Sequence, residues 1–132
     1  MSDYFSLFID CFPDLMMGLG ATLLIAVVSM FFAFIIGMIL ALMGLSRYKG
    51  LKAIYYSYVA FIRGVPVLIF ALFLFFGVGG LLNIQFNPIV AGIITLSINA
   101  SAFLAEIFRG GILAVDKGQI EAARSLGFGY FR

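Results

Sequence analysis

Three long apolar stretches without a charged residue dominate the chain. They run from Leu15 to Leu45, from Gly64 to Leu82 and from Pro88 to Ala105. A helix needs about 20 residues to cross the hydrocarbon core of a bilayer, and the stretches lack the period-two alternation of strands. We therefore predict an all-α membrane protein whose residues 1–132 all belong to a single transmembrane domain. The three predicted spans cover about residues 15–45, 62–82 and 88–108.

The breaks between and around these stretches predict local structure. Pro66 removes a backbone donor near the start of the second span and predicts a kink or break there. Pro88 suits the first turn of the third helix, after a polar loop at 83–88. Tyr4–Phe12, stopped by Pro13, is expected to form an amphipathic turn at the membrane surface. Leu51–Phe61, which carries three tyrosines, is expected at the headgroup level.

Composition strengthens the membrane assignment and excludes several classes of function. Of the 132 residues, 64% are hydrophobic and only 11% are charged, whereas soluble domains carry about 25% charged residues. With no histidine and one cysteine, Cys11, an internal disulfide, a histidine- or cysteine-based metal site and a Ser–His nucleophile are excluded. No glycine-rich phosphate loop occurs, and a dispersed net charge of +2 is no nucleic-acid footprint. A soluble globular enzyme is therefore the least favoured class.

The distribution of charge predicts the orientation in the membrane. Asp3, Asp10 and Asp14 precede the first basic residue, Arg47, and basic residues gather in the polar loop at 46–52 and after Arg109. Cytoplasmic loops carry the excess of Lys and Arg, so the N-terminus is predicted outside and the C-terminus inside. A signal peptide needs an early positive region, and we expect the opening segment to be retained.

Small residues recur every four positions in the first predicted span. Ser29, Ala33, Gly37 and Ala41 form one stripe along a helix. Such a stripe allows another helix to approach closely. It predicts helix packing without identifying the partner helix.

The third span carries a polar stripe with spacings of 4, 3, 4 and 3. Because polar groups cost free energy in lipid, this face should look into protein or a wet cavity. Glu106 and Arg109 are close enough to pair. The pair either snorkels at the cytoplasmic edge or helps to line a solute path. The stripe consists of Thr95, Asn99, Ala102, Glu106 and Arg109.

Two further features each have an ordinary and a functional interpretation. Arg63 is either a positive-inside anchor or a brace for carbonyls freed by the break at Gly64 and Pro66. The segment Glu121–Leu126 predicts a short helix with Gly127 as its left-handed cap. That helix is either a solvated terminal helix or a docking surface for another protein.

Three stretches together resemble the permease subunits of bacterial ABC importers for polar amino acids. Residues 18–29 (GLGATLLIAVVS) resemble the opening span of that family, and residues 63–68 (RGVPVL) resemble its Arg-Gly-x-Pro-x-Leu motif. Residues 102–127 (AFLAEIFRGGILAVDKGQIEAARSLG) resemble the long run that leads into the EAA motif. This third match is long, ordered and specific, and it favours the docking interpretation of the C-terminal helix.

The resemblance implies a mechanism and a set of partners. In such importers the EAA segment, here about residues 115–132, is a short cytoplasmic coupling helix in a cleft of an ABC ATPase, which hydrolyses the ATP. The resemblance therefore implies that this chain is non-enzymatic and binds no cofactor. The polar stripe and Arg63 would then belong to the translocation path, with Asn99 and Glu106 contacting an amino acid. A second permease subunit, an extracytoplasmic solute-binding protein and a multi-pass location in the bacterial inner membrane are also implied. The residues carried over to the docking surface are Gly118, Gln119, Glu121, Ala122, Ala123 and Gly127.

The EAA motif of the family continues beyond the position of Arg132 and is followed by two more spans. We therefore expect the chain to be the N-terminal part of a five-span importer subunit. Two other functions stay open at this point: a small secondary transporter driven by an ion gradient through Glu106, and a membrane scaffold without a transport role.

Overall fold

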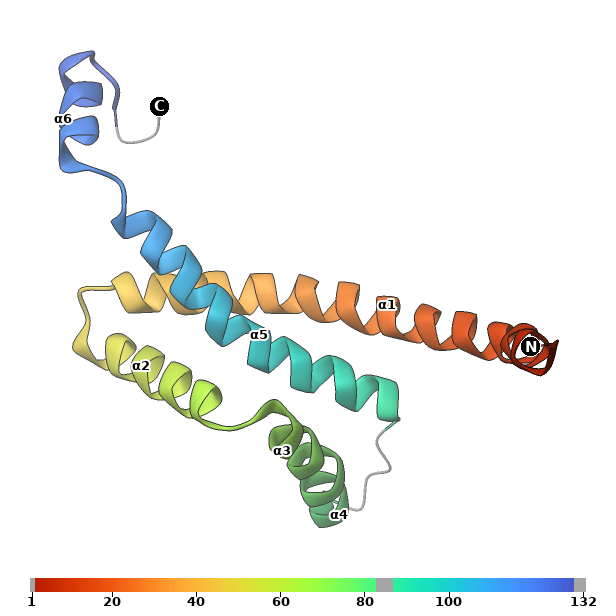
Figure 1. The fold of residues 1–132 in the computed structure, drawn as a ribbon. Coiled ribbons are helices and arrows are strands. Elements are labelled where there is room, and N and C mark those ends of the chain that lie inside the picture. Colours follow the sequence, from red (N-terminus) through yellow and green to blue (C-terminus); the bar gives the residue numbers. More distant parts are fainter. Residues whose placement is uncertain (1, 83–86, 130–132) are drawn as a thin grey trace.

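The computed structural model describes residues 2–82 and 87–129, and within these ranges it contains helices and no strand. Figure 1 shows two long helices, a bent middle segment and a short C-terminal helix that extends away from the others. This arrangement confirms the predicted all-α class. The elements are α1 (Ser2–Leu45), α2 (Lys49–Gly64), α3 (Val67–Leu72), the π-helix η1 (Phe73–Val78), α4 (Gly79–Leu82), α5 (Pro88–Leu113) and α6 (Lys117–Ser125).

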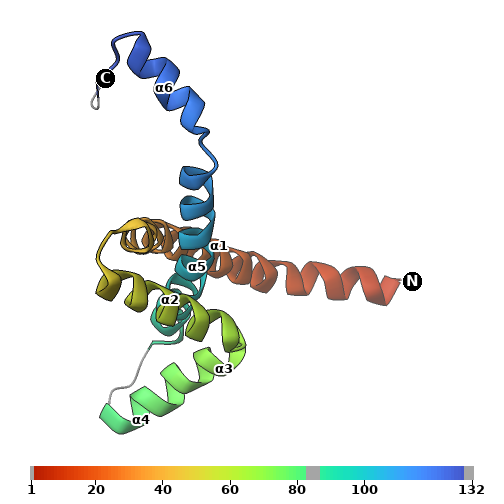
Figure 2. The same ribbon diagram turned by 90° about the vertical axis from the view of Figure 1, so that its left-hand side faces the viewer.

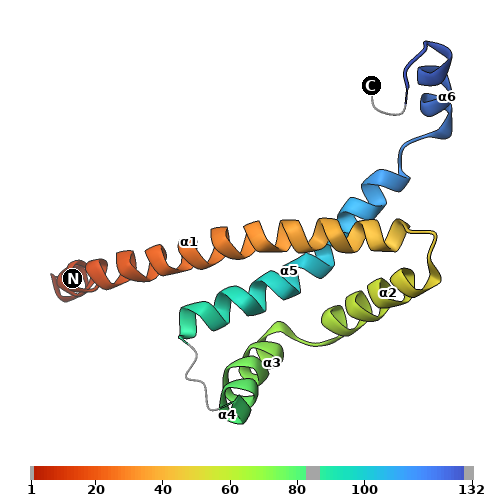
Figure 3. The same ribbon diagram turned by 180° about the vertical axis from the view of Figure 1, so that it is seen from behind.

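Helices α1 and α5 are each long and apolar enough to cross a membrane. The qualifying segment of α1 is Phe8–Leu45, with 38 residues, and that of α5 is Pro88–Leu113, with 26 residues. Both extend past the predicted limits of 15–45 and 88–108. The two helices pack against each other over the C-terminal half of α1, and α5 crosses α1 there (Figures 1 and 3).

The expected stop at Pro13 is wrong, because α1 continues through it from Ser2 to Leu45. Tyr4–Phe12 is therefore the start of the first helix and not a separate turn. Proline removes one backbone hydrogen bond and clashes with the preceding turn, but the rest of this 44-residue helix keeps its own bonds. The cost is local, and the first turns of α1 curve away from the axis of the remaining helix (Figure 1).

The predicted break at Pro66 is confirmed, and it is sharper than a kink. Val65 is extended, with φ −104° and ψ 126°, because the ring of a following proline disfavours the helical region. The axes on the two sides of this break differ by 99°. The second span predicted at 62–82 is thus not one helix. Three spans result if α2 and the segment 67–81 count as one broken span.

The connections differ from the expected loops in length. The loop predicted at 46–52 is shorter, because α1 ends at Leu45 and α2 already begins at Lys49, so Lys49 and Lys52 lie in the first turn of α2. At the start of α5, Asn87 caps the helix by accepting a hydrogen bond from the Ile89 amide at 2.9 Å, and Pro88 occupies the first turn as predicted. The remainder of the polar loop, residues 83–86, lies outside the described residues.

The loop between α1 and α2 and the short helix α6 lie toward the same end of the molecule (Figure 1). The N-terminus lies at the opposite end of α1. In Figure 2, α6 points away from the bundle formed by α1, α2 and α5. Within the described ranges, α6 contacts no other helix, so its connection to the bundle is the backbone that leaves α5.

Candidate coupling helix and interhelical polar cluster

The small-residue stripe of α1 lies where α1 meets α5. All four residues of the stripe (Ser29, Ala33, Gly37 and Ala41) are buried. A methyl group added at Gly37 would lie 2.9 Å from the Leu104 Cβ atom and 3.1 Å from the Ser101 carbonyl oxygen. Only a residue without a side chain fits at this approach, because both neighbours belong to or adjoin the α5 backbone.

The N-terminal part of the polar stripe on α5, from Thr95 to Ala102, is largely covered by protein. Thr95 is 2% exposed and Ala102 is fully buried, whereas Asn99 is half-buried. The Thr95 hydroxyl has no hydrogen-bond partner among the described residues, which is costly for a buried polar atom. Thr95 also lines an open groove of about 420 Å³ between η1 and α5, whose other walls include Phe75 and Phe76.

The C-terminal part of the stripe, Glu106 and Arg109, forms a polar cluster with α2. The Tyr55 hydroxyl donates a hydrogen bond to Glu106 Oε1 and accepts one from Arg109 Nε at 3.1 Å. The expected ion pair between Glu106 and Arg109 is present, with Nη2 and Oε2 3.6 Å apart. The Arg109 guanidinium also lies 5.8 Å from the Tyr55 ring centre. Glu106 and Arg109 are thus both bound to a residue of another helix.

Two further residues of α2 contact α5 beyond this cluster. The Tyr58 hydroxyl donates to the Ile98 carbonyl at 3.1 Å and lies 2.8 Å from the Ser101 hydroxyl. The exposed Arg63 lies at the end of α2, with its guanidinium 5.1 Å from the Phe103 ring centre. This cation–π contact is an interaction that neither sequence-based interpretation of Arg63 anticipated.

Helix α6 is capped at both ends by its own sequence. The Asp116 side chain accepts a hydrogen bond from the Gly118 amide at 2.7 Å, the usual arrangement at a helix N-terminus. Gly127 has φ 83°, which confirms it as the left-handed cap. The Gly127 amide donates to the Arg124 carbonyl at 3.0 Å and the Phe128 amide to the Ala123 carbonyl at 3.1 Å. This pair of bonds is the Schellman motif.

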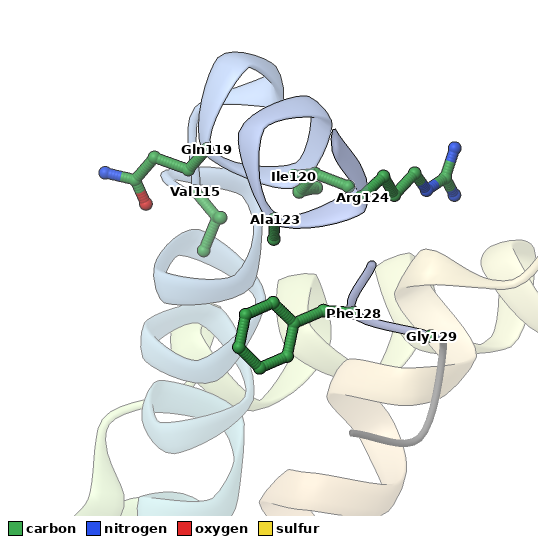
Figure 4. Close-up of a pocket in the computed structure, with 7 residues that line it drawn as sticks. All are labelled: Val115, Gln119, Ile120, Ala123, Arg124, Phe128 and Gly129. Carbon is green, nitrogen blue, oxygen red and sulfur yellow. The ribbon is translucent and has the colours of Figure 1, made fainter. Parts of the chain in front are cut away.

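The apolar contact that accompanies a Schellman motif is also present. Figure 4 shows the Phe128 ring beneath α6, directed toward Ala123 and Val115, whereas Gln119 points away from this ring. Of the six candidate docking residues, Ala123 is half-buried and the other five are exposed: Gly118, Gln119, Glu121, Ala122 and Gly127. The helix therefore presents a low, exposed surface on a locally self-stabilised turn.

Sequence reasoning missed Tyr55 as a central residue. The tyrosines of Leu51–Phe61 were expected at the headgroup level, yet Tyr55 is fully buried and Tyr58 bonds to α5, while Tyr56 is 52% exposed. The available signal was the spacing of Tyr55, Val59 and Ile62, which are the buried residues of α2. A spacing of 4 and 3 indicates one helix face turned toward protein.

Comparison with known proteins agrees with this architecture. Residues 33–132 match the family described as binding-protein-dependent transport system inner membrane component. The chain belongs to this family, and it is therefore an inner-membrane permease chain.

Individual relatives cover nearly the whole chain. The probable amino-acid ABC transporter permease protein YckA of Bacillus subtilis is 41% identical over 94% of the chain and 54% of its own length. The arginine transport system permease protein ArtQ of the same organism is 38% identical over 96% of the chain and 58% of its own length. The crystal structure of an amino acid ABC transporter with histidines superposes with a TM-score of 0.85 at 37% identity, over 96% of this chain and 58% of that one. The chain thus spans about half the length of the relatives it matches.

Proposed function

We propose that the chain is part of the membrane-spanning subunit of an ATP-driven importer, in which it forms part of the path for an amino acid. The observation that carries this proposal is α6. It is an exposed helix with the EAA sequence, capped at both ends, that stands away from the bundle at the end of α5. Such a helix is suited to insert into a cleft of another protein and to pass its movement to α5.

The ATPase is proposed to dock on the exposed residues of α6. Glu121 and Ala122 belong to the outer surface, and Ala123 is braced from below by Phe128. Small side chains allow a close approach between surfaces, and Glu121 supplies a charge for recognition. ATP is hydrolysed on that partner, and this chain contributes no catalytic group.

The position of α6 supports the proposed orientation in the membrane. The basic segment at 46–52, which includes the loop after α1 and the first turn of α2, lies toward the same end of the molecule as α6 (Figure 1), and cytoplasmic ends carry the positive charge. We therefore place this end in the cytoplasm and the N-terminus outside. A solute-binding protein would then deliver the amino acid from the N-terminal side, and a second permease subunit would complete the path.

The proposed path residues fall into two groups. Thr95 and Asn99 are the candidates to contact the solute, because Thr95 has an unsatisfied hydroxyl at the groove between η1 and α5. Glu106, Arg109 and Arg63 are engaged with Tyr55 and Phe103, so they would shape the cytoplasmic end of the path through helix positions. The relatives' names include amino-acid, arginine and glutamine permeases, which supports an amino acid as the solute.

Charge reversal on α6 tests the docking proposal. The Glu121→Lys variant of the permease is purified in detergent, and its binding to the cognate ATPase is measured by co-purification. We expect binding to fall at least about tenfold, because a charge-assisted contact is replaced by a repulsive one. Lys52→Glu on α2, another exposed charge, is the matched control and should bind normally. Equal binding of Glu121→Lys and wild type would remove the docking assignment.

A further inference from the structure

Tyr55 fills a space that only a glycine on α1 leaves open. The side chain is fully buried between α1 and α5. A methyl group at Gly44 would lie 3.0 Å from two carbon atoms of the Tyr55 ring and 3.1 Å from Arg109 Cδ. The ring and the arginine stem therefore rest on the bare backbone of α1. This contact sets the position along α5 at which α2 packs.

The Tyr55 hydroxyl is the shared partner of the two charged side chains of α5. It donates to Glu106 and accepts from Arg109, whereas the direct contact between the two charges is longer, at 3.6 Å. Hydrogen bonds with ionised partners are stronger than neutral ones, and Glu106 and Arg109 are only 32% and 25% exposed. The cluster is thus a directional connection between α2 and α5 and not only a neutralised ion pair on α5.

The cluster is one of the direct links between α5 and α2, which are also connected through α1 because both helices pack on it. Within the described residues α6 touches neither α1 nor α2, so a displacement of α6 reaches α2 through α5. Glu106 and Arg109 lie near the C-terminal end of α5, the end that continues into α6. Beyond the cluster, α2 ends at the break before Pro66, where a shift of α2 would change the position of the segment 67–82.

We propose that Tyr55 is a positioning residue that couples α5 to α2 during transport. When α6 is displaced, the bonds of Tyr55 to Glu106 and Arg109 would oblige α2 to move with α5 and prevent the two helices from slipping past each other. Tyr58, one turn further along, adds a second bond to α5 but does not contact the charged pair. This inference rests on the proposed function and adds to it a residue through which motion passes from α5 to α2.

The test is Tyr55→Phe, which keeps the ring on Gly44 and removes only the hydroxyl. The permease, assembled with its ATPase and binding protein in proteoliposomes, is assayed for amino-acid uptake and for ATP hydrolysis in parallel. We expect normal assembly and basal hydrolysis, with uptake per ATP lowered about tenfold, the factor that a bond of about 1.4 kcal/mol represents. Tyr56→Phe is the matched control, because Tyr56 is adjacent, half exposed, and expected to couple normally.

A second variant separates coupling from packing. If Tyr55 acts through Glu106, then Glu106→Gln should also lower uptake per ATP, and the double variant should lose no more than the larger single loss. An unchanged ratio of uptake to hydrolysis in Tyr55→Phe overturns the inference, and so does a parallel fall of both rates or a loss of assembly. Absence of ATP-dependent uptake in the wild type would instead contradict the proposed function itself.

Discussion

At Gly37, α1 approaches α5 so closely that the loss of stability caused by an added methyl group can be estimated from the contact distances. In Gly37→Ala the new methyl group would lie 2.9 Å from Leu104 Cβ, 3.1 Å from the Ser101 carbonyl oxygen and 3.3 Å from the Ala105 amide nitrogen. Ordinary contacts between carbon atoms are about 3.5–4.0 Å. Two of the three obstructing atoms are backbone, so the helices must separate by roughly 0.5–1 Å, and contacts along the interface lose a quarter to a half of their attraction.

We expect Gly37→Ala to destabilise the protein by about 1–3 kcal/mol, the usual cost of overpacking. The free energy of unfolding is measured by a denaturant titration of the purified permease in detergent. Thermal unfolding of the same samples gives the midpoint temperature. Gly20→Ala is the control on the same helix, because a methyl group there meets nothing within 4 Å and alanine favours the helix by roughly 0.5–1 kcal/mol. Equal stability of Gly37→Ala and Gly20→Ala would refute the packing argument.

Three further variants test single features of the structure. Gly127→Ala forces a side chain into the left-handed region at φ 83° and should weaken α6 by about 1–2 kcal/mol, seen as weaker ATPase binding, whereas Gly129→Ala should bind normally. Asp116→Ala removes the N-cap bond to Gly118 and should cost about 0.5–2 kcal/mol, seen as faster hydrogen exchange of the α6 amides; unchanged exchange would contradict the cap. Thr95→Val removes a buried, unpaired hydroxyl and should raise the unfolding temperature, because such a group costs about 1–3 kcal/mol; a lower unfolding temperature would show that the hydroxyl is bonded.

Features set by local chemistry were predictable from the sequence. The break at Pro66 follows from the steric restriction that proline places on Val65, and the cap at Gly127 from the need for a positive φ. Pairing of Glu106 with Arg109 follows from their spacing on one helix. In each case the deciding atoms are within a few residues of one another, so a short stretch of sequence contains the relevant information.

Features set by contacts between helices were not predictable in the same way. Tyr55 was expected at the membrane surface, since tyrosine is typical of that level, but Gly44 of α1 opens a buried place for its ring. Pro13 was expected to end a segment, and the apolar continuation of α1 outweighs its local cost. The size of the bend, 99°, was also beyond prediction, because Pro66 indicates only where the chain turns, whereas the contacts of α3 with α5 involve residues distant in the sequence.

The energy source of transport tests the central claim most directly. Uptake of a labelled amino acid is measured in proteoliposomes that contain the complete permease, its ATPase and its solute-binding protein, with ATP enclosed or omitted and with an uncoupler added or not. We expect uptake to require ATP, to persist in the presence of the uncoupler and to be abolished by Glu121→Lys on α6. Uptake that continues without ATP and collapses with the uncoupler would contradict the central claim.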